Sequence, residues 1–214
     1  MGIAQGLGNA GLTPGIYTSS TRPASPVDGL VISETDTDTL QVYKGSAWSP
    51  VSGLQLISRT TSGPSATIAY DNVFSSTYSS YMVVLESVSG SSTAYVYLKF
   101  RYAGPTTQSA TYYYAGNGLN TSGAAANLYY ANYNQVELST CSAEISRSTI
   151  MFYGVGNASE KPYFTSQSFT NNGDRSMRSI GGMQDTARTY TGFELSLSTG
   201  NITATTAIYG LAKS

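Results

Sequence analysis

From residue 54 onward, apolar and polar residues alternate over many short segments separated by clusters of Gly, Ser, Asn and Asp. In the segment 94–102, for example, apolar residues at every second position alternate with polar ones such as Lys99, the pattern of a half-buried strand. No segment shows helical periodicity. We therefore predict an all-β protein whose residues 53–214 form an antiparallel β-sandwich of the jelly-roll type, with about eight to ten strands. The strands are expected at 55–60, 67–70, 81–88, 94–102, 127–138, 145–155, 163–169, 176–183, 190–197 and 202–211.

Two further parts precede this sandwich. Residues 1–20 are rich in Gly and small residues and have no periodicity, so we expect an extended arm that attaches the chain to a larger assembly. Residues 21–52 contain two short apolar runs separated by a polar reversal and are expected to form a β-hairpin module. Because an isolated hairpin is only marginally stable, this module must pack on something else.

The hairpin module contains four residues with evident structural roles. Pro23 and Pro26 hold an extended entry, because proline restricts its own φ and biases the preceding residue toward β or polyproline geometry. Gly29 follows Asp28 in a turn, and the chain's only tryptophan, Trp48, returns toward the hairpin after a second turn. We expect Pro23, Pro26, Gly29 and Trp48 to stabilise the module.

The same segment carries a sequence motif. It has the form T-R-P-x-x-P-x-x-G, followed by an apolar pair, E-T-D-T and V-Y-x-G-x-x-W, within residues 21–48. This motif resembles a module found in virion appendage proteins of bacteriophages, of the tail-fibre and decoration type. The resemblance implies a protein of the virus particle, on its tail or capsid, and homotrimerisation is a further expectation from it. Contacts with other virion proteins are then expected through residues 1–52.

Composition narrows the possible functions. Only 11% of the residues are charged and the net charge is −1, so a nucleic-acid-binding role has little support. The start lacks the features of a signal peptide, and no apolar run approaches the roughly 18 residues that would cross a membrane. We therefore expect synthesis in the host cytoplasm and no membrane insertion.

Catalysis and metal binding also find little support. The chain has no histidine, the commonest general base and metal ligand, and its acidic residues are scattered, so we expect no enzyme activity, no cofactor and no metal. Cys141, the single cysteine, is expected to be an ordinary reduced thiol. The acids Glu34, Asp36 and Asp38 alternate and would share one face of a strand, but we place them in a solvated turn rather than in a cation site.

Two stretches, 104–123 and 123–133, interrupt the strand pattern with tyrosines, asparagines and glycines. We expect long loops with exposed aromatic side chains, which either bind a ligand or pack between subunits. Their candidate residues are Tyr112, Tyr113, Tyr114, Asn117, Tyr129, Tyr130 and Tyr133.

Three functions remain open at this point. The leading hypothesis is a trimeric short tail fibre or tail-tip protein, docked through its N-terminal region, that presents the sandwich to host-surface glycan. A capsid decoration protein that stabilises the phage head is the first alternative, and the absence of a fibre shaft favours it. A carbohydrate-binding or adhesion module is the second alternative.

Overall fold

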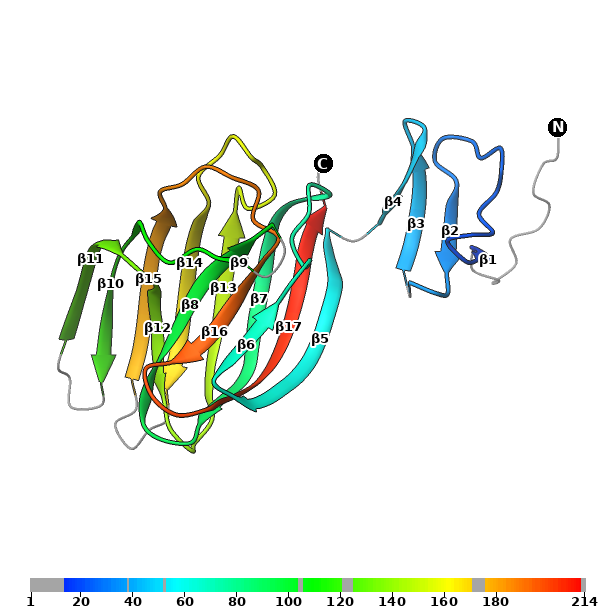
Figure 1. Cartoon of the computed structure of the whole chain (residues 1–214). Coiled ribbons are helices and arrows are strands. Elements are labelled where there is room, and N and C mark those ends of the chain that lie inside the picture. Colours follow the sequence, from blue (N-terminus) through cyan, green and yellow to red (C-terminus); the bar gives the residue numbers. More distant parts are fainter. Residues whose placement is uncertain are drawn as a thin grey trace. The chain divides into compact units, whose positions relative to one another are not determined.

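The structure, a computed structural model, describes residues 14–37, 39–51, 53–103, 106–120, 125–170 and 176–212. These residues form β-strands and no helix, which confirms the all-β class and the β-sandwich; the jelly-roll connectivity stays a prediction. No helix capable of spanning a membrane occurs in the described ranges. The chain divides into two compact units, residues 1–53 and 54–214, which are described separately below (Figure 1).

The first unit contains a four-stranded sheet in the order β1-β2-β3-β4. Strand β1 runs parallel to β2, whereas β3 is antiparallel to both β2 and β4. The bounds are β1 Gly15–Tyr17, β2 Val31–Glu34, β3 Thr39–Lys44 and β4 Ala47–Pro50. The expected arm of residues 1–20 is therefore wrong at its end, because residues 15–17 pair with β2 and complete the sheet; the arm's first 13 residues lie outside the described part of the chain.

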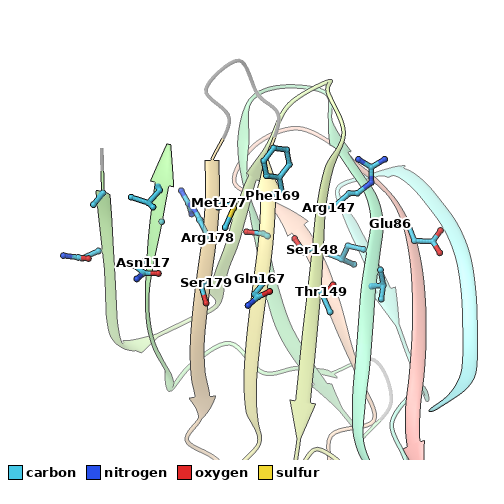
Figure 2. A pocket seen from close by; sticks show the side chains of 17 residues that line it. Glu86, Asn117, Arg147, Ser148, Thr149, Gln167, Phe169, Met177, Arg178 and Ser179 are labelled. Carbon is cyan, nitrogen blue, oxygen red and sulfur yellow. The ribbon is translucent and has the colours of Figure 1, made fainter. Parts of the chain in front are cut away.

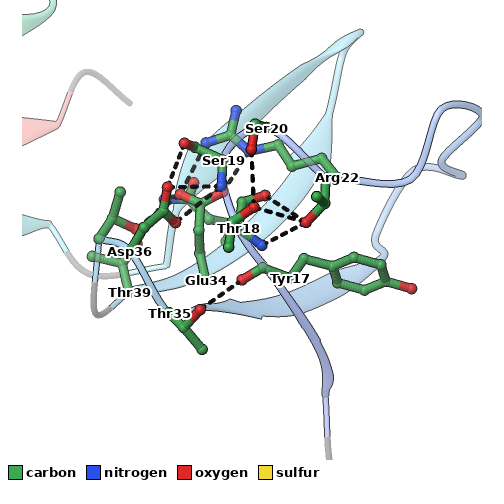
Figure 3. Close-up of polar contacts among 12 residues, drawn as sticks. Tyr17, Thr18, Ser19, Ser20, Arg22, Glu34, Thr35, Asp36 and Thr39 are labelled. Atoms are coloured by element: carbon green, nitrogen blue, oxygen red, sulfur yellow. Dashed lines mark hydrogen bonds and ion pairs between the residues drawn. The ribbon is translucent and has the colours of Figure 1, made fainter.

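A polar cluster attaches the segment after β1 to the β2–β3 reversal (Figure 3). The Arg22 guanidinium donates to both carboxylate oxygens of Glu34, with an Nε–Oε1 distance of 2.5 Å and an Nη2–Oε2 distance of 3.0 Å. Asp36 accepts the backbone N–H of Ser19 at 2.9 Å and its hydroxyl at 2.5 Å. The two carboxylates thus connect segments that are 12 and 17 residues apart in sequence.

This cluster corrects the expectation of a solvated acidic turn at Glu34, whereas Asp36 is exposed in the turn after β2. Glu34 is only 1% exposed, and its pKa is lowered because the hydrogen bond from Arg22 outweighs the effect of burial. The pKa of Asp36 is lowered chiefly by the hydrogen bond from the Ser19 side chain. Asp38 lies outside the described residues. Within the sequence motif, Arg22 and Glu34 are therefore structural partners, while Asp36 is hydrogen-bonded to Ser19.

The other residues singled out in this unit lie around the same sheet. Pro23 and Pro26 are half-buried, and Gly29 has a φ of 85°, a left-handed conformation that glycine adopts without steric cost. Trp48 pairs with Tyr43 across β3 and β4, and their rings lie 5.3 Å apart. Trp48 is half-buried, so it covers one side of the hairpin without filling a closed core.

The second unit is a sandwich of an eight-stranded and a five-stranded sheet (Figure 1). The larger sheet has the order β11-β10-β15-β14-β13-β7-β17-β5, and the smaller has β12-β8-β16-β6, with β9 paired to β8. The bounds are β5 Leu54–Ser65, β6 Thr67–Tyr70, β7 Tyr78–Gly90, β8 Ala94–Tyr102, β9 Thr106–Thr107, β10 Tyr112–Asn120, β11 Ala125–Tyr133, β12 Val136–Cys141, β13 Ser146–Tyr153, β14 Tyr163–Thr170, β15 Ser176–Gln184, β16 Gly192–Leu197 and β17 Ile202–Ala212.

The core between the sheets is aromatic. Phe100 on β8 and Phe152 on β13 face each other with ring centroids 5.4 Å apart, and Phe193 on β16 lies 5.7 Å from Phe152; all three side chains are fully buried. Cys141 is also buried, and desolvation raises the pKa of its thiol to about 11. The thiol therefore stays protonated at neutral pH, as expected of a structural cysteine.

One predicted strand proves to be two. Residues 127–138 were expected to be continuous, but β11 ends at Tyr133 in the large sheet and β12 begins at Val136 in the small one. Asn132 near the corner has a φ of 56°, a conformation that asparagine tolerates better than most residues. The chain thus passes from the large sheet to the small one between Tyr133 and Val136.

Candidate functional site: the open face of the large sheet

One face of the eight-stranded sheet packs on the smaller sheet, and the other carries exposed side chains. Along β14, Phe164, Ser166 and Ser168 point inward and are buried, whereas Tyr163 and Phe169 point outward and are about half exposed, at 54% and 47%. We call the outward side of β7, β13, β14, β15, β10 and β11 the open face.

The strand register arranges the open face in four rows. Residues directly paired on neighbouring strands share a face, and successive same-face residues along a strand lie about 6.8 Å apart. Three such steps separate the first row from the fourth, a distance of roughly 20 Å. The tyrosine row is Tyr153, Tyr163, Met183 and Tyr113; the small-residue row is Met151, Thr165, Gly181 and Ala115, with Tyr129 beside it; the amide row is Thr149, Gln167, Ser179, Asn117 and Asn127; and the arginine row is Arg147, Phe169, Met177, Leu119 and Ala125.

Short side chains hollow out the middle of this face. Gly181, Ala115 and Thr165 line a depression of 730 Å³ that extends to Gln167 and Asn117 in the amide row. A Cβ placed on Gly181 would meet no atom closer than 3.8 Å, so the fold itself leaves room at this glycine. The hollow therefore arises from the choice of small residues between rows of large ones.

Two further hollows lie on the open face, one at each end. At the tyrosine row, a hollow of 530 Å³ is lined by Tyr113, Tyr129, Tyr153 and Tyr163. At the arginine row, a hollow of 610 Å³ is lined by apolar and polar side chains together (Figure 2). Apolar walls with a few hydrogen-bonding groups are typical of small-ligand sites.

Charged groups are few on this surface, and most are paired. Glu86 at the arginine row accepts from Arg59, with 2.6 Å between Nη2 and Oε2. Arg178, which borders the same hollow, pairs with the buried Glu137. Arg147 is exposed, and no ion pair connects it to any acid in the described residues. The open face is thus mostly neutral, with one uncompensated cation.

The residues predicted from sequence are divided between the two sides of the sheet. Tyr113, Asn117 and Tyr129 lie on the open face, where Tyr113 is 37% and Tyr129 is 80% exposed. Tyr130 stacks on Tyr114 at 4.7 Å, and Tyr133 contacts Tyr130 at 5.1 Å. Tyr114, Tyr130 and Tyr133 line the opposite side of β10 and of the edge strand β11.

The expected long loops are wrong over most of their length, and so is the exposure expected for two tyrosines. Residues 112–120 and 125–133 are paired strands, while 104–105 and 121–124 lie outside the described residues. Tyr112 and Tyr114 are buried; their hydroxyls accept the backbone N–H groups of Phe100 at 2.7 Å and Glu137 at 3.1 Å. Burial raises the pKa of both phenols, so they act as neutral hydrogen-bonding groups within the core.

Glycines explain why a strand forms where the sequence indicates a loop. A Cβ on Gly116 would lie 2.2 Å from the carbonyl oxygen of Ser179, and one on Gly118 would lie 3.0 Å from that of Met177. These glycines therefore allow β10 to approach β15 closely. In the sequence, the same glycines favoured the expectation of a long loop.

Most residues of the open face were not predicted as site residues. Tyr153, Tyr163, Gln167 and Phe169 lie in strands that were predicted correctly, but an alternating pattern does not tell which side of a strand meets the second sheet. In 163–169 the aromatic residues Tyr163 and Phe169 share a side with Thr165 and Gln167, while Phe164 shares the other side with two serines, so the sequence gives no clear signal for the outward side.

The described residues contain no group of three or more His, Cys, Asp or Glu side chains that could hold a metal ion. Comparisons with family models, curated proteins and solved structures find no match to this chain. The geometry of the open face is therefore the main evidence on function, together with the motif of the first unit.

Proposed function

We propose that this chain is a non-enzymatic virion protein of a bacteriophage that binds host-surface glycan on the open face of its sandwich. The motif of residues 21–48 supports the virion setting, and the expected homotrimer belongs to the same proposal. The observation that carries the glycan function is the sequence of rows on the open face: exposed tyrosines, a hollow lined by small residues, then a row of amides and hydroxyls.

Each row suits one part of a sugar. A tyrosine ring has a negatively charged face, which favours the polarised C–H groups of a pyranose ring stacked on it. The side-chain amides of Gln167, Asn117 and Asn127 each offer donors and an acceptor, which match sugar hydroxyls. The hollow at Gly181 and Ala115 gives a ring access to both rows.

The amide row also argues against a dry protein interface on this face. If a flat apolar surface covered it, the amides and hydroxyls of the row would lose water without gaining partners, and each such group costs about 1–3 kcal/mol. A hydroxylated ligand supplies those partners. Glycan therefore satisfies the face better than an apolar protein surface does.

Glycan binding can be tested with polysaccharides purified from candidate host surfaces, measured by titration calorimetry. We expect Tyr163→Ala to weaken binding at least tenfold, equivalent to about 1.4 kcal/mol. Tyr95→Ala is the matched control, because Tyr95 is 43% exposed, close to the 54% of Tyr163, but lies on β8 of the other sheet. Equal loss in the two variants, or no loss in either, would refute a site on the open face.

The virion setting has its own test, which is immunogold labelling of intact particles with an antibody against residues 54–214. Label on the tail tip supports a receptor-binding appendage, and label spread over the head supports the decoration alternative. Particles without label would contradict the virion proposal altogether.

A further inference from the structure

We infer that the saccharide bound by the open face is acidic and that Arg147 pairs with its anionic group. This inference rests on the proposed glycan function and specifies the ligand class and one specificity residue. It starts from the charge balance of the arginine row and the groups that surround Arg147.

Arg147 is the uncompensated charge among the described residues that line the three hollows. Those residues include two other charged groups, and both have partners: Glu86 accepts from Arg59, and Arg178 pairs with Glu137. Since Arg59 already neutralises Glu86, that carboxylate offers Arg147 little further attraction. Among the described residues that line the hollow at this row, Arg147 is thus the cation that no ion pair neutralises.

The neighbours of Arg147 suit a sugar acid better than a free inorganic anion. In the register of the sheet, Phe169 is the direct partner of Arg147, and Met177 follows it on β15. Both side chains are exposed, at 47% and 63%, and with Arg147 they line one hollow, in which the Arg147 side chain extends toward β7, away from Phe169 (Figure 2). Gln167 and Thr149 of the amide row lie one step away, about 6.8 Å along their strands.

These three features match the parts of an acidic pyranose. The planar guanidinium binds a carboxylate through two parallel hydrogen bonds. The apolar surface of Phe169 and Met177 accepts the C–H face of the ring or the methyl of an acyl substituent. The amide row bonds the hydroxyl and acylamino groups on the far side of the ring. A bare phosphate or sulfate ion would use the first feature alone.

Two kinds of sugar share this chemistry, uronic acids and sialic acids, so the test uses both. Oligogalacturonate and oligosialate are each titrated into the full chain alongside their own methyl esters, which differ in charge and little else. We expect at least one acid to bind at least tenfold more tightly than its ester, with affinity that falls as salt rises. Arg147→Gln should remove that preference and Arg147→Lys should keep part of it, whereas Lys99→Gln on the other sheet is the charge-matched control.

Each outcome separates this inference from the proposed function. Esters that bind as tightly as the acids, or an acid preference that survives Arg147→Gln, would overturn the role of Arg147. If neutral oligosaccharides bind and Tyr163→Ala weakens them, the glycan site stands while the acidic specificity falls. If neither acids nor neutral sugars bind, or binding ignores both Tyr163→Ala and Arg147→Gln, both proposals fail.

Discussion

Two adjacent glycines of β15 provide the most direct test of the open face. Gly181 and Gly182 are neighbours in a strand, so side chains added to them project to opposite faces of the sheet. A Cβ on Gly181 would lie 3.8 Å from its nearest neighbours, the carbonyl oxygen of Phe164 and the Cγ2 of Thr165. A Cβ on Gly182 would lie 2.3 Å from the carbonyl oxygen of Tyr113.

These distances predict opposite effects of the same substitution. Gly181→Ala should stabilise the sandwich by about 0.5–1 kcal/mol, because alanine loses less backbone entropy than glycine in a strand and meets no obstacle here. Gly182→Ala should destabilise it by about 1–3 kcal/mol, since the obstacle is backbone that cannot rotate away. For a unit of this size, 1 kcal/mol shifts the melting temperature by roughly 2–4 °C. We therefore expect a rise of roughly 1–4 °C for Gly181→Ala and a fall of roughly 2–12 °C for Gly182→Ala.

Differential scanning calorimetry of the full chain measures both variants. The sole tryptophan lies in the first unit, so fluorescence identifies that unit's transition and leaves the remaining one to the sandwich. Shifts of the same sign, or a harmless Gly182→Ala, would mean that β15 presents its other side to solvent. The rows of the open face would then be wrong, and with them the hollow at Gly181.

Two further predictions concern the first unit. The folded-state pKa of Glu34 is lowered by its hydrogen bond with Arg22, so the pair's contribution to stability is present above the ordinary glutamate pKa of about 4.3 and is lost as the pH falls through the folded-state value. Trp48 fluorescence should show the unit's melting temperature falling below about pH 4, and Glu34→Gln should flatten that profile; a flat wild-type profile would contradict the pair's role. Trp48→Ala should cost about 1–2 kcal/mol by removing a half-buried ring and its contact with Tyr43. It should speed proteolysis at Arg22 and Lys44 without shifting the sandwich transition, and unchanged resistance would show that the ring does not stabilise the unit.

The sequence predicted strands well where each strand has one apolar side, and poorly where packing with other strands decides. The alternation in 94–102 locates β8 correctly, because its buried positions are mostly apolar and its more exposed ones are mostly polar or tyrosine. In β10, by contrast, Gly116 and Gly118 look like turn residues, and only the approach of β15 explains them. Such non-local contacts leave no trace in the local pattern.

The open face was missed for a related reason. In β14 the inward residues include Phe164, Ser166 and Ser168, and the outward ones include Tyr163, Gln167 and Phe169, so both sides carry aromatic and polar residues. Hydrophobicity therefore does not identify the side of this strand that faces the core. The outward rings gain no burial energy in the isolated chain. Under the proposed function, a ligand that covers them recovers that energy on binding.

Because few residues of the chain are charged, the unpaired Arg147 would have a large effect on which saccharides the open face prefers. With 11% of residues charged, most polar surface consists of neutral hydroxyl and amide groups, whose contacts with a sugar are short-ranged and little affected by salt. Neutral groups of this kind bind many saccharides with similar affinity, since each hydrogen bond replaces one to water. Under the proposed function, an ion pair at Arg147 would add a contribution that neutral sugars cannot make. The rings and amides would then provide affinity for saccharides in general, and the Arg147 guanidinium would select among them by charge.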